Sequence, residues 1–287
     1  SSRGIIYDKD FNQLVFNQPV FNLVVIESEL PEGEKERILK KVADSIDYDY
    51  SKLVEKINES DSDEIAIIND LNHKDLITLE IMTRDFPGIE VKKEVKRYYQ
   101  DGKVFSHLTG YIGKISPEEM EIFGEGYFIN DYVGKSGIER AYEDVLRIIP
   151  GKIKKERDVF GNIKSEELIS MVQSGKSLVL SIDSDLQKKI YSVLEDNLKK
   201  IGSKNAAVIA MDPQTGEVLS LVSFPGFDNN VFSFGDSAEI RNLFNDPDKP
   251  LFNRVTAGTY PVGSTIKPLM AVAALEEKIV SPQKEFY

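Results

Sequence analysis

The sequence predicts an α+β protein with a mixed first domain and a second domain built on an antiparallel sheet with packed helices. Apolar residues recur at both strand and helix periods in the first half of the chain. In the second half a strand, an amphipathic helix and a β-hairpin follow one another. The length of 287 residues suits about two domains of ordinary size.

The first half mixes strands with short helices. Residues 21–26 (FNLVVI) form a β-rich run, and residues 34–46 carry apolar side chains at helical spacing. Those side chains are Ile38, Leu39, Val42 and Ile46. An acidic stretch follows at residues 58–64, but it lacks the glycine and the closing glutamate of a calcium-binding loop. We interpret it as a solvated loop.

Two further helices have start signals. Ser116 is followed by Pro117 and by Glu119, which together predict an N-cap, a first helical residue and a capping box. Ser136 and Glu139 repeat the same spacing before an apolar stripe. We therefore expect Glu139 to serve helix capping and contacts within the first domain.

The character of the chain changes after about residue 170. Residues 177–182 predict a strand, and a capping box from Ser184 to Gln187 predicts the start of an amphipathic helix. Residues 206–223 predict a hairpin that turns at residues 212–216 (DPQTG).

A charged stretch with several glycines, residues 150–175, predicts the linker between the domains. We accordingly divide the chain into residues 1–168 and 169–287.

Composition excludes several functions. A net charge of −12 argues against nucleic acid as a partner and against binding to anionic lipid through a basic face. The chain has no cysteine and only two histidines, so thiolate chemistry, zinc sites and a serine–histidine triad are not expected. No apolar run approaches the roughly 18 residues of a membrane span.

Ser264 and Lys267 are the candidate catalytic residues. They lie in residues 259–275 (TYPVGSTIKPLMAVAAL), whose alanine-rich end predicts a helix. A spacing of three residues puts both side chains on one helix face. A serine hydroxyl becomes a nucleophile when a nearby base takes its proton, and a lysine amine can do so where its pKa is lowered. The helix start also offers a backbone N–H to a developing oxyanion.

Taken alone, the S-x-x-K pattern is weak. Serine and lysine are common residues, and Ser281 and Lys284 form a second instance that we interpret as a coincidence in a loop. The simple alternative for Ser264 is an N-cap serine beside a solvated lysine.

Several ordered segments change that balance, because together with the S-x-x-K pattern they resemble one family. They are residues 3–25 (RGIIYDKDFNQLVFNQPVFNLVV), 107–113 (HLTGYIG), 134–147 (GKSGIERAYEDVLR), 178–187 (LVLSIDSDLQ), 212–230 (DPQTGEVLSLVSFPGFDNN) and 250–268 (PLFNRVTAGTYPVGSTIKP). S-x-x-K is itself a signature of penicillin-binding proteins. The chain resembles the class B penicillin-binding proteins of the cell-elongation machinery, although Val262 and Ile266 stand where the family usually has proline and phenylalanine.

The resemblance implies a peptidoglycan D,D-transpeptidase. Ser264 would form an acyl-enzyme with the D-Ala-D-Ala end of a stem peptide, assisted by Lys267, and β-lactams would imitate that donor. The resemblance implies no metal and no organic cofactor. It implies a non-catalytic pedestal, residues 1–168, that binds a membrane glycosyltransferase and elongation proteins. It also implies a place on the extracytoplasmic face of the cell membrane, with an N-terminal anchor outside this chain.

Family members carry two further active-site motifs, S-x-N and K-T-G, well after the S-x-x-K motif. We expect both beyond residue 287, so that residues 169–287 are an incomplete transpeptidase domain and the chain alone is not acylated. Two alternatives stay open. One is a β-lactamase or β-lactam sensor, against which the long pedestal counts. The other is a non-catalytic scaffold of the elongation complex.

Overall fold

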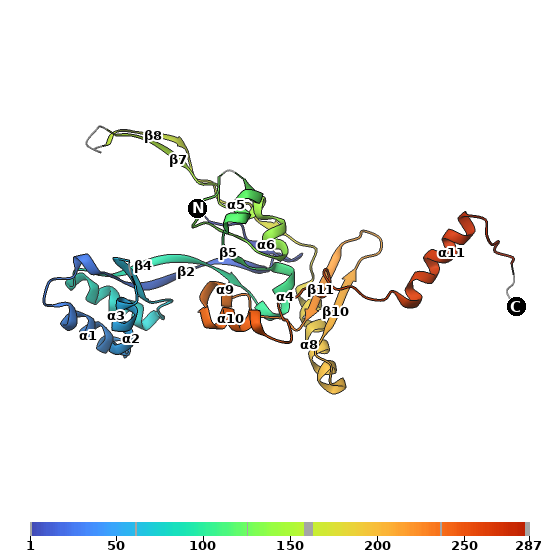
Figure 1. Cartoon of the computed structure of the whole chain (residues 1–287), viewed down its shortest axis with the longest axis horizontal. Coiled ribbons are helices and arrows are strands. Elements are labelled where there is room, and N and C mark those ends of the chain that lie inside the picture. Colours follow the sequence, from blue (N-terminus) through green and yellow to red (C-terminus); the bar gives the residue numbers. More distant parts are fainter. Residues whose placement is uncertain (1, 61, 125, 158–162, 236, 285–287) are drawn as a thin grey trace.

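The structure, a computed structural model, describes residues 2–60, 62–124, 126–157, 163–235 and 237–284. Figure 1 shows an elongated molecule with a central body, a helical globule at one end, a projecting hairpin and a C-terminal helix that stands apart.

The strands are β1 (Ile6–Tyr7), β2 (Gln13–Ile26), β3 (Glu64–Ile68), β4 (Ile89–Tyr99), β5 (Ile112–Lys114), β6 (Tyr132–Gly134), β7 (Lys152–Arg157), β8 (Ile163–Ser170), β9 (Leu178–Val179), β10 (Ala206–Met211) and β11 (Val218–Phe224). The α-helices are α1 (Lys35–Ser45), α2 (Tyr50–Asn58), α3 (His73–Met82), α4 (Gly102–Thr109), α5 (Pro117–Phe123), α6 (Gly137–Ala141), α7 (Glu143–Leu146), α8 (Ser184–Ile201), α9 (Val231–Phe234), α10 (Ser237–Asn245) and α11 (Lys267–Glu276). Three 3₁₀ turns are η1 (Glu27–Glu29), η2 (Thr83–Asp85) and η3 (Gly263–Ile266). The predicted α+β class is confirmed.

A long antiparallel ribbon of β2 and β4 forms the spine of the first half. The two strands pair continuously from Val15 opposite Tyr99 to Val25 opposite Ile89. On the other edge of β2, β3 pairs near its end and β1 near its start, and β9 runs parallel to β1. The predicted strand at residues 21–26 is therefore the end of a strand of 14 residues.

The helical globule packs α1, α2 and α3 against the far end of this ribbon (Figure 1). Ile38, Leu39 and Val42 of α1 are buried there, as their spacing predicted. α1 ends at Ser45, so Ile46 follows the helix and is only partly buried. The acidic stretch at residues 58–64 joins α2 to β3, and its residue 61 lies outside the described residues.

The central core draws on both halves of the chain. Ile6, Tyr99 and Phe105 of the first half pack with Ile182 of the second. The strand predicted at residues 177–182 is reduced to the two residues of β9, because only this short segment reaches β1. The predicted hairpin at residues 206–223 is confirmed as β10 and β11, on which α8 packs.

Three expectations about helix starts have different outcomes. The capping box of Ser116 and Glu119 is present. The box at Ser184 is wrong: the N-cap of α8 is Asp183, and Ser184 donates a hydrogen bond to the buried Asp8 instead. Ser136 precedes α6 without a side-chain capping bond, and the carboxylate of Glu139 is held in an ion-pair network. The hydroxyl of Ser184 and the carboxylate of Glu139 thus each bind a distant buried partner in place of the expected cap.

Residues 150–175, where the linker was predicted, contain a two-stranded hairpin. β7 and β8 pair so that Lys154 lies opposite Glu167, and opposite charges across a ladder stabilise such a ribbon. Residues 158–162 of this stretch lie outside the described residues. Within the described ranges no helix is long and apolar enough to cross a membrane.

Candidate active site

Ser264 lies in η3 and Lys267 is the first residue of α11. The backbone N–H of Lys267 donates to the carbonyl oxygen of Ser264, which closes the 3₁₀ turn. Residues three apart lie above one another in a 3₁₀ turn, so the two side chains share a face. Gly263 has a φ of +54°, a left-handed conformation that glycine adopts without strain, and Pro268 follows in the first turn, where no N–H is needed. The local sequence thus places a hydroxyl and an amine together at the start of a helix.

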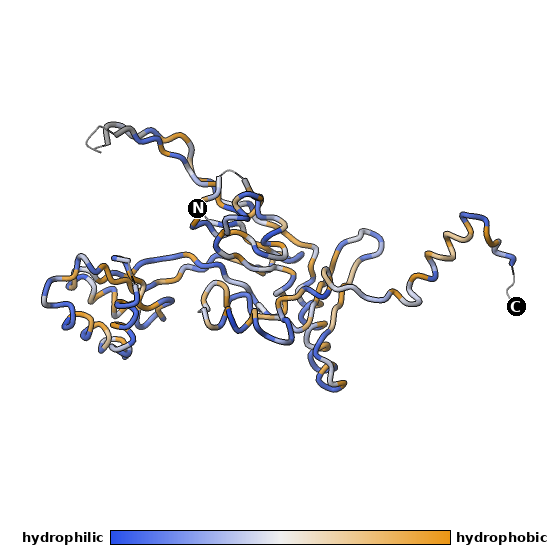
Figure 2. Tube along the Cα trace, in the orientation of Figure 1, coloured by the Kyte–Doolittle hydropathy of each residue, from blue (hydrophilic) through white to orange (hydrophobic). Residues whose placement is uncertain are grey.

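Both side chains are exposed, and α11 stands away from the body of the molecule. Among the residues that the structure describes, neither Ser264 Oγ nor Lys267 Nζ has a hydrogen-bond or ion-pair partner. Figure 2 shows that much of α11 is apolar, and Leu269, Met270 and Val272 are exposed on it. A nucleophilic serine needs a positioned base and an oxyanion site, and the exposed head of α11 provides neither in complete form.

The segment before the serine is fixed to the body. The carbonyl oxygen of Pro250 lies 2.7 Å from Nε2 of His107 in α4. The backbone N–H of Arg254 donates to Ser223 Oγ at 2.9 Å, and Tyr260 donates its hydroxyl to the carbonyl of Arg254 at 2.8 Å. From Pro261 to Met270 every residue is exposed. The anchored part of the lead-in therefore ends at Tyr260, four residues before the serine.

His107 is a packing residue of α4. Its ring is buried, receives the hydroxyl of Ser106 at Nδ1 and packs edge-to-face on Phe227. Since a carbonyl only accepts hydrogen bonds, Nε2 carries the proton toward Pro250. Burial lowers the pKa of His107 from 6.5 to about 4, although the hydrogen bond to Pro250 opposes this shift. The ring is therefore neutral at pH 7.

Two asparagines, Asn229 and Asn230, join the second half of the chain to the first. Asn229 donates its amide to the carbonyl of Ser106 and that of Gly110. Asn230 makes a reciprocal pair with the backbone of Tyr99, accepting its N–H and donating to its carbonyl, both at 2.9 Å. An asparagine amide imitates a peptide group, but the sequence carries no signal of which distant backbone it pairs with.

A buried ion-pair network holds the N-terminal segment to β4, α6 and α7. Glu139 accepts from Nε of Arg3 and from Nε of Arg97, each at 2.7 Å, and is fully buried. Glu143 accepts from Arg3 at 2.6 Å and from the backbone N–H of Gly134. Burial by itself lowers the pKa of Arg3, but the adjacent carboxylates outweigh this and raise it. Glu139 thus links the start of the chain, β4 and α6.

No group of three or more histidine, cysteine, aspartate or glutamate side chains within the described ranges is arranged to hold a metal ion. The second S-x-x-K instance lies beyond α11, where Ser281 and Lys284 are exposed.

Comparison with known proteins assigns both parts of the chain. Residues 1–180 match the penicillin-binding protein dimerisation domain, and residues 206–287 match the penicillin-binding protein transpeptidase domain. The chain is 33% identical to the peptidoglycan D,D-transpeptidase MrdA of Escherichia coli K12 over 98% of its own length and 44% of that protein. It is 31% identical to penicillin-binding protein 3 of Bacillus subtilis 168, over 96% of its length and 40% of that protein.

Solved structures give the same fold. Penicillin-binding protein PBP2 of Helicobacter pylori, in a complex with MreC, aligns with a TM-score of 0.76 at 24% identity. The alignment covers 99% of this chain and 52% of that one. The chain therefore spans about half or less of the length of the proteins it matches.

Proposed function

The chain belongs to the penicillin-binding proteins, and we propose that the full-length protein is a peptidoglycan D,D-transpeptidase with Ser264 as its nucleophile. The observation that carries this proposal is the placement of Ser264 and Lys267 on one face at the head of α11, inside the part of the chain that matches the transpeptidase domain. The curated relatives named peptidoglycan D,D-transpeptidase support the same reaction.

The proposed reaction has two steps. Ser264 Oγ attacks the carbonyl carbon between the terminal D-alanines of a stem peptide, and its proton passes by way of Lys267 Nζ to the leaving nitrogen. The C–N bond breaks, D-alanine departs and an ester remains on the serine. An amine of a second stem peptide then attacks the ester, forms the cross-link and returns a proton to Ser264 Oγ. Backbone N–H groups at the head of α11 would stabilise each oxyanion. A β-lactam would acylate the same oxygen.

The exposure of both side chains bears on the 287-residue chain itself. Because Ser264 and Lys267 contact no third functional group among the described residues, we infer that the competent site needs groups from elsewhere in the full-length protein. The isolated chain would then be a pedestal with an incomplete catalytic domain, and a scaffolding role is the second candidate function for it. The match of residues 1–180 to a dimerisation domain favours either role over a β-lactamase.

We also propose a setting for the protein. The division at residues 1–168 and 169–287 separates a pedestal from the catalytic part, although Ile182 and Asn230 of the second part pack on the first. The H. pylori relative was solved as a complex of PBP2 with MreC, which supports elongation proteins as partners. We assign their binding, and that of a membrane glycosyltransferase, to the pedestal. A transpeptidase of cell-wall peptides would act on the extracytoplasmic face of the membrane, held by an anchor.

The test is covalent labelling of the full-length protein with a fluorescent penicillin, followed by peptide mass spectrometry. The adduct is expected on Ser264 and is expected to vanish in Ser264→Ala. Thr265→Ala is the matched control, since it removes the neighbouring exposed hydroxyl and should keep the label. An unlabelled wild-type protein, or a label that persists in Ser264→Ala, would overturn the assignment.

A further inference from the structure

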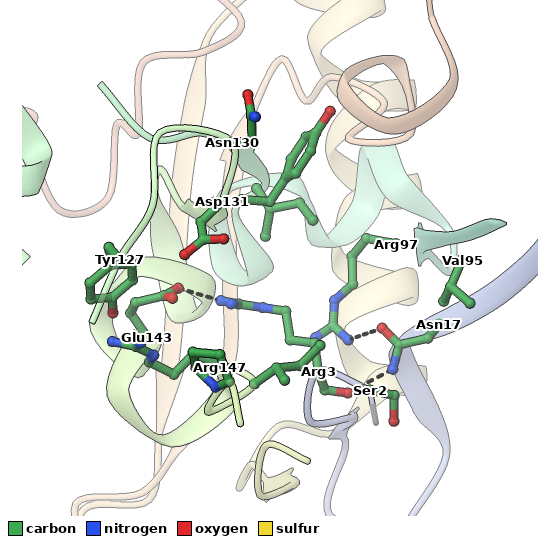
Figure 3. A pocket seen from close by; sticks show the side chains of 14 residues that line it. Ser2, Arg3, Asn17, Val95, Arg97, Tyr127, Asn130, Asp131, Glu143 and Arg147 are labelled. Carbon is green, nitrogen blue, oxygen red and sulfur yellow. Dashed lines mark hydrogen bonds and ion pairs between the residues drawn. The ribbon is translucent and has the colours of Figure 1, made fainter. Parts of the chain in front are cut away.

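A cavity of about 380 Å³ lies in the pedestal, far along the chain from Ser264. It is bounded by the N-terminal segment, the β2–β4 ribbon, β5, the loop before β6 and α7. Figure 3 shows Arg3 crossing this space between Glu143 and Arg97. The volume lies at the lower end of the range of small-molecule sites, roughly 300–1,000 Å³.

Three buried polar atoms on its lining residues have no hydrogen-bond partner among the described residues: Arg97 Nη2, Glu143 Oε1 and Tyr127 Oη. Arg97, Glu143 and Tyr127 are 3%, 2% and 8% exposed. Buried polar atoms in native proteins are almost always hydrogen-bonded to protein, water or ligand, because a bare one is costly. Three such atoms around one cavity indicate an occupant that forms hydrogen bonds.

The kinds of atom define the chemistry of that occupant. Arg97 Nη2 can only donate, Glu143 Oε1 can only accept, and the hydroxyl of Tyr127 can do both. Burial raises the pKa of Tyr127, so its hydroxyl keeps its proton. The ion pairs place Arg3 and Glu139 between the other two charged residues, so the donor and the acceptor are not adjacent. The occupant therefore has hydrogen-bonding groups spread along its length.

The charges add a second restriction. The ionic groups at the cavity are three guanidinium groups and three carboxylates. This count includes Glu139, which is not in the lining but pairs with the lining residues Arg3 and Arg97. The six groups are Arg3, Arg97, Arg147, Asp131, Glu139 and Glu143. Their formal charges cancel, so the cavity favours a ligand without net charge. The rim also carries apolar surface from Val95 and Ile112 and the half-exposed ring of Tyr132.

We propose that this pedestal cavity binds a neutral saccharide of one or two rings. Sugar hydroxyls both donate and accept, are spaced along the molecule and carry no charge, and their C–H faces pack on aromatic and aliphatic side chains. A free amino acid fits less well, because its ammonium and carboxylate are attached to one carbon whereas Glu143 and Arg97 are separated by Arg3.

The probe is N,N′-diacetylchitobiose, with cellobiose and D-alanine as comparison ligands, titrated into the full-length protein by calorimetry. The choice of an N-acetylated disaccharide, although not the site itself, rests on the proposed function, since peptidoglycan strands are built of N-acetylated amino sugars. We expect one saccharide per chain with a Kd of about 1 mM or tighter. Cellobiose binding as tightly would support the saccharide class without a role for the acetamido groups.

Two variants locate the binding. Val95→Trp adds a large side chain at the exposed mouth of the cavity and should abolish binding, whereas Lys93→Trp, two residues away on β4 and outside the lining, should not. Tyr127→Phe removes one hydroxyl and should weaken binding about five- to ten-fold, whereas Tyr142→Phe, at an exposed tyrosine outside the lining, should leave it unchanged. If Val95→Trp does not fold, Tyr127→Phe carries the test alone.

Three results would overturn the proposal. The first is no saccharide binding at about 10 mM, which would mean that the cavity holds water only. The others are saccharide binding that both cavity variants leave intact, and binding of D-alanine without either disaccharide. Penicillin labelling of Ser264 is scored separately in the same variants. If no saccharide binds but penicillin labelling is intact, only the pedestal site is refuted. The labelling test with Ser264→Ala does not depend on whether a saccharide binds.

Discussion

The imidazole Nε2 of His107 donates a hydrogen bond to the carbonyl oxygen of Pro250 at 2.7 Å. This bond joins α4 of the pedestal to the segment that leads to Ser264, across 143 residues of sequence. Because the ring is buried and neutral, the bond ties the position of that segment to the protonation state of one histidine.

Acid should weaken the protein through this ring. The pKa of His107 falls from 6.5 in the unfolded chain to about 4 in the folded one, so the contribution is complete above pH 6.5. It is lost as the pH falls from 6.5 to 4, because only the unfolded state takes up the proton there. The difference is worth about 3 kcal/mol. Urea unfolding at pH 7 and pH 4 should show a steeper loss of unfolding free energy in wild type than in His107→Gln, which keeps an N–H donor but does not titrate.

The comparison between variants matters because many carboxylates of this acidic chain titrate in the same pH range. His73→Gln, at the exposed start of α3, is the matched control. Equal pH dependence in wild type and His107→Gln would show that the buried ring is not the group responsible.

Removing the carboxylate of Glu139 should destabilise the pedestal strongly. Glu139→Gln leaves Arg3 and Arg97 buried with their charges only partly compensated, and breaking a buried pair in this way typically costs about 3–5 kcal/mol. The free energy of unfolding in urea measures the effect. Glu34→Gln, in the exposed pair with Arg37, is the control and should cost less than about 1 kcal/mol. Similar losses in the two variants would refute a structural role for the buried network.

Asn230 should hold the second half of the chain to β4. Asn230→Ala removes both hydrogen bonds to the Tyr99 backbone and leaves two buried peptide groups without partners, which should cost about 1–3 kcal/mol. Hydrogen exchange should increase in residues 225–235 and at Tyr99. Asn242→Ala, on the exposed side of α10, should change neither quantity. Unchanged exchange at Tyr99 would contradict this attachment.

These contacts mark the limit of prediction from the sequence. Local patterns were enough for the α+β class, the hairpin of β10 and β11 and the buried face of α1, because periodicity and turn residues act within a few positions. They misassigned the hydroxyl of Ser184, which binds Asp8 across 176 residues, and the capping role of Glu139. Contacts of Glu139 within the first domain were expected, but not that its partner would be Arg3, 136 residues away. A capping rule uses only residues close in sequence, whereas the partner of a buried polar group is set by the tertiary structure.

The candidate site shows the same division. The alanine-rich run after Lys267 was sufficient to predict the helix, and the spacing of three positions predicted that Ser264 and Lys267 share one face at its head. The anchoring of their lead-in by His107 and Ser223 was not predicted, because those contacts depend on how distant parts of the fold meet.

The role of Lys267 gives the sharpest test of the site. In the full-length protein Lys267→Arg keeps a positive charge at the same place but cannot give up its proton under ordinary conditions, so it cannot accept the proton of Ser264. A lost general base typically slows such a step by about 100-fold or more, and the rate of penicillin acylation should fall accordingly. Lys284→Arg, in the second S-x-x-K instance, is the matched control and should acylate at the wild-type rate. The opposite result, with Lys284→Arg impaired and Lys267→Arg active, would move the nucleophile to Ser281. Equal rates in all three proteins would leave the charge of Lys267, and not its proton transfer, as its contribution.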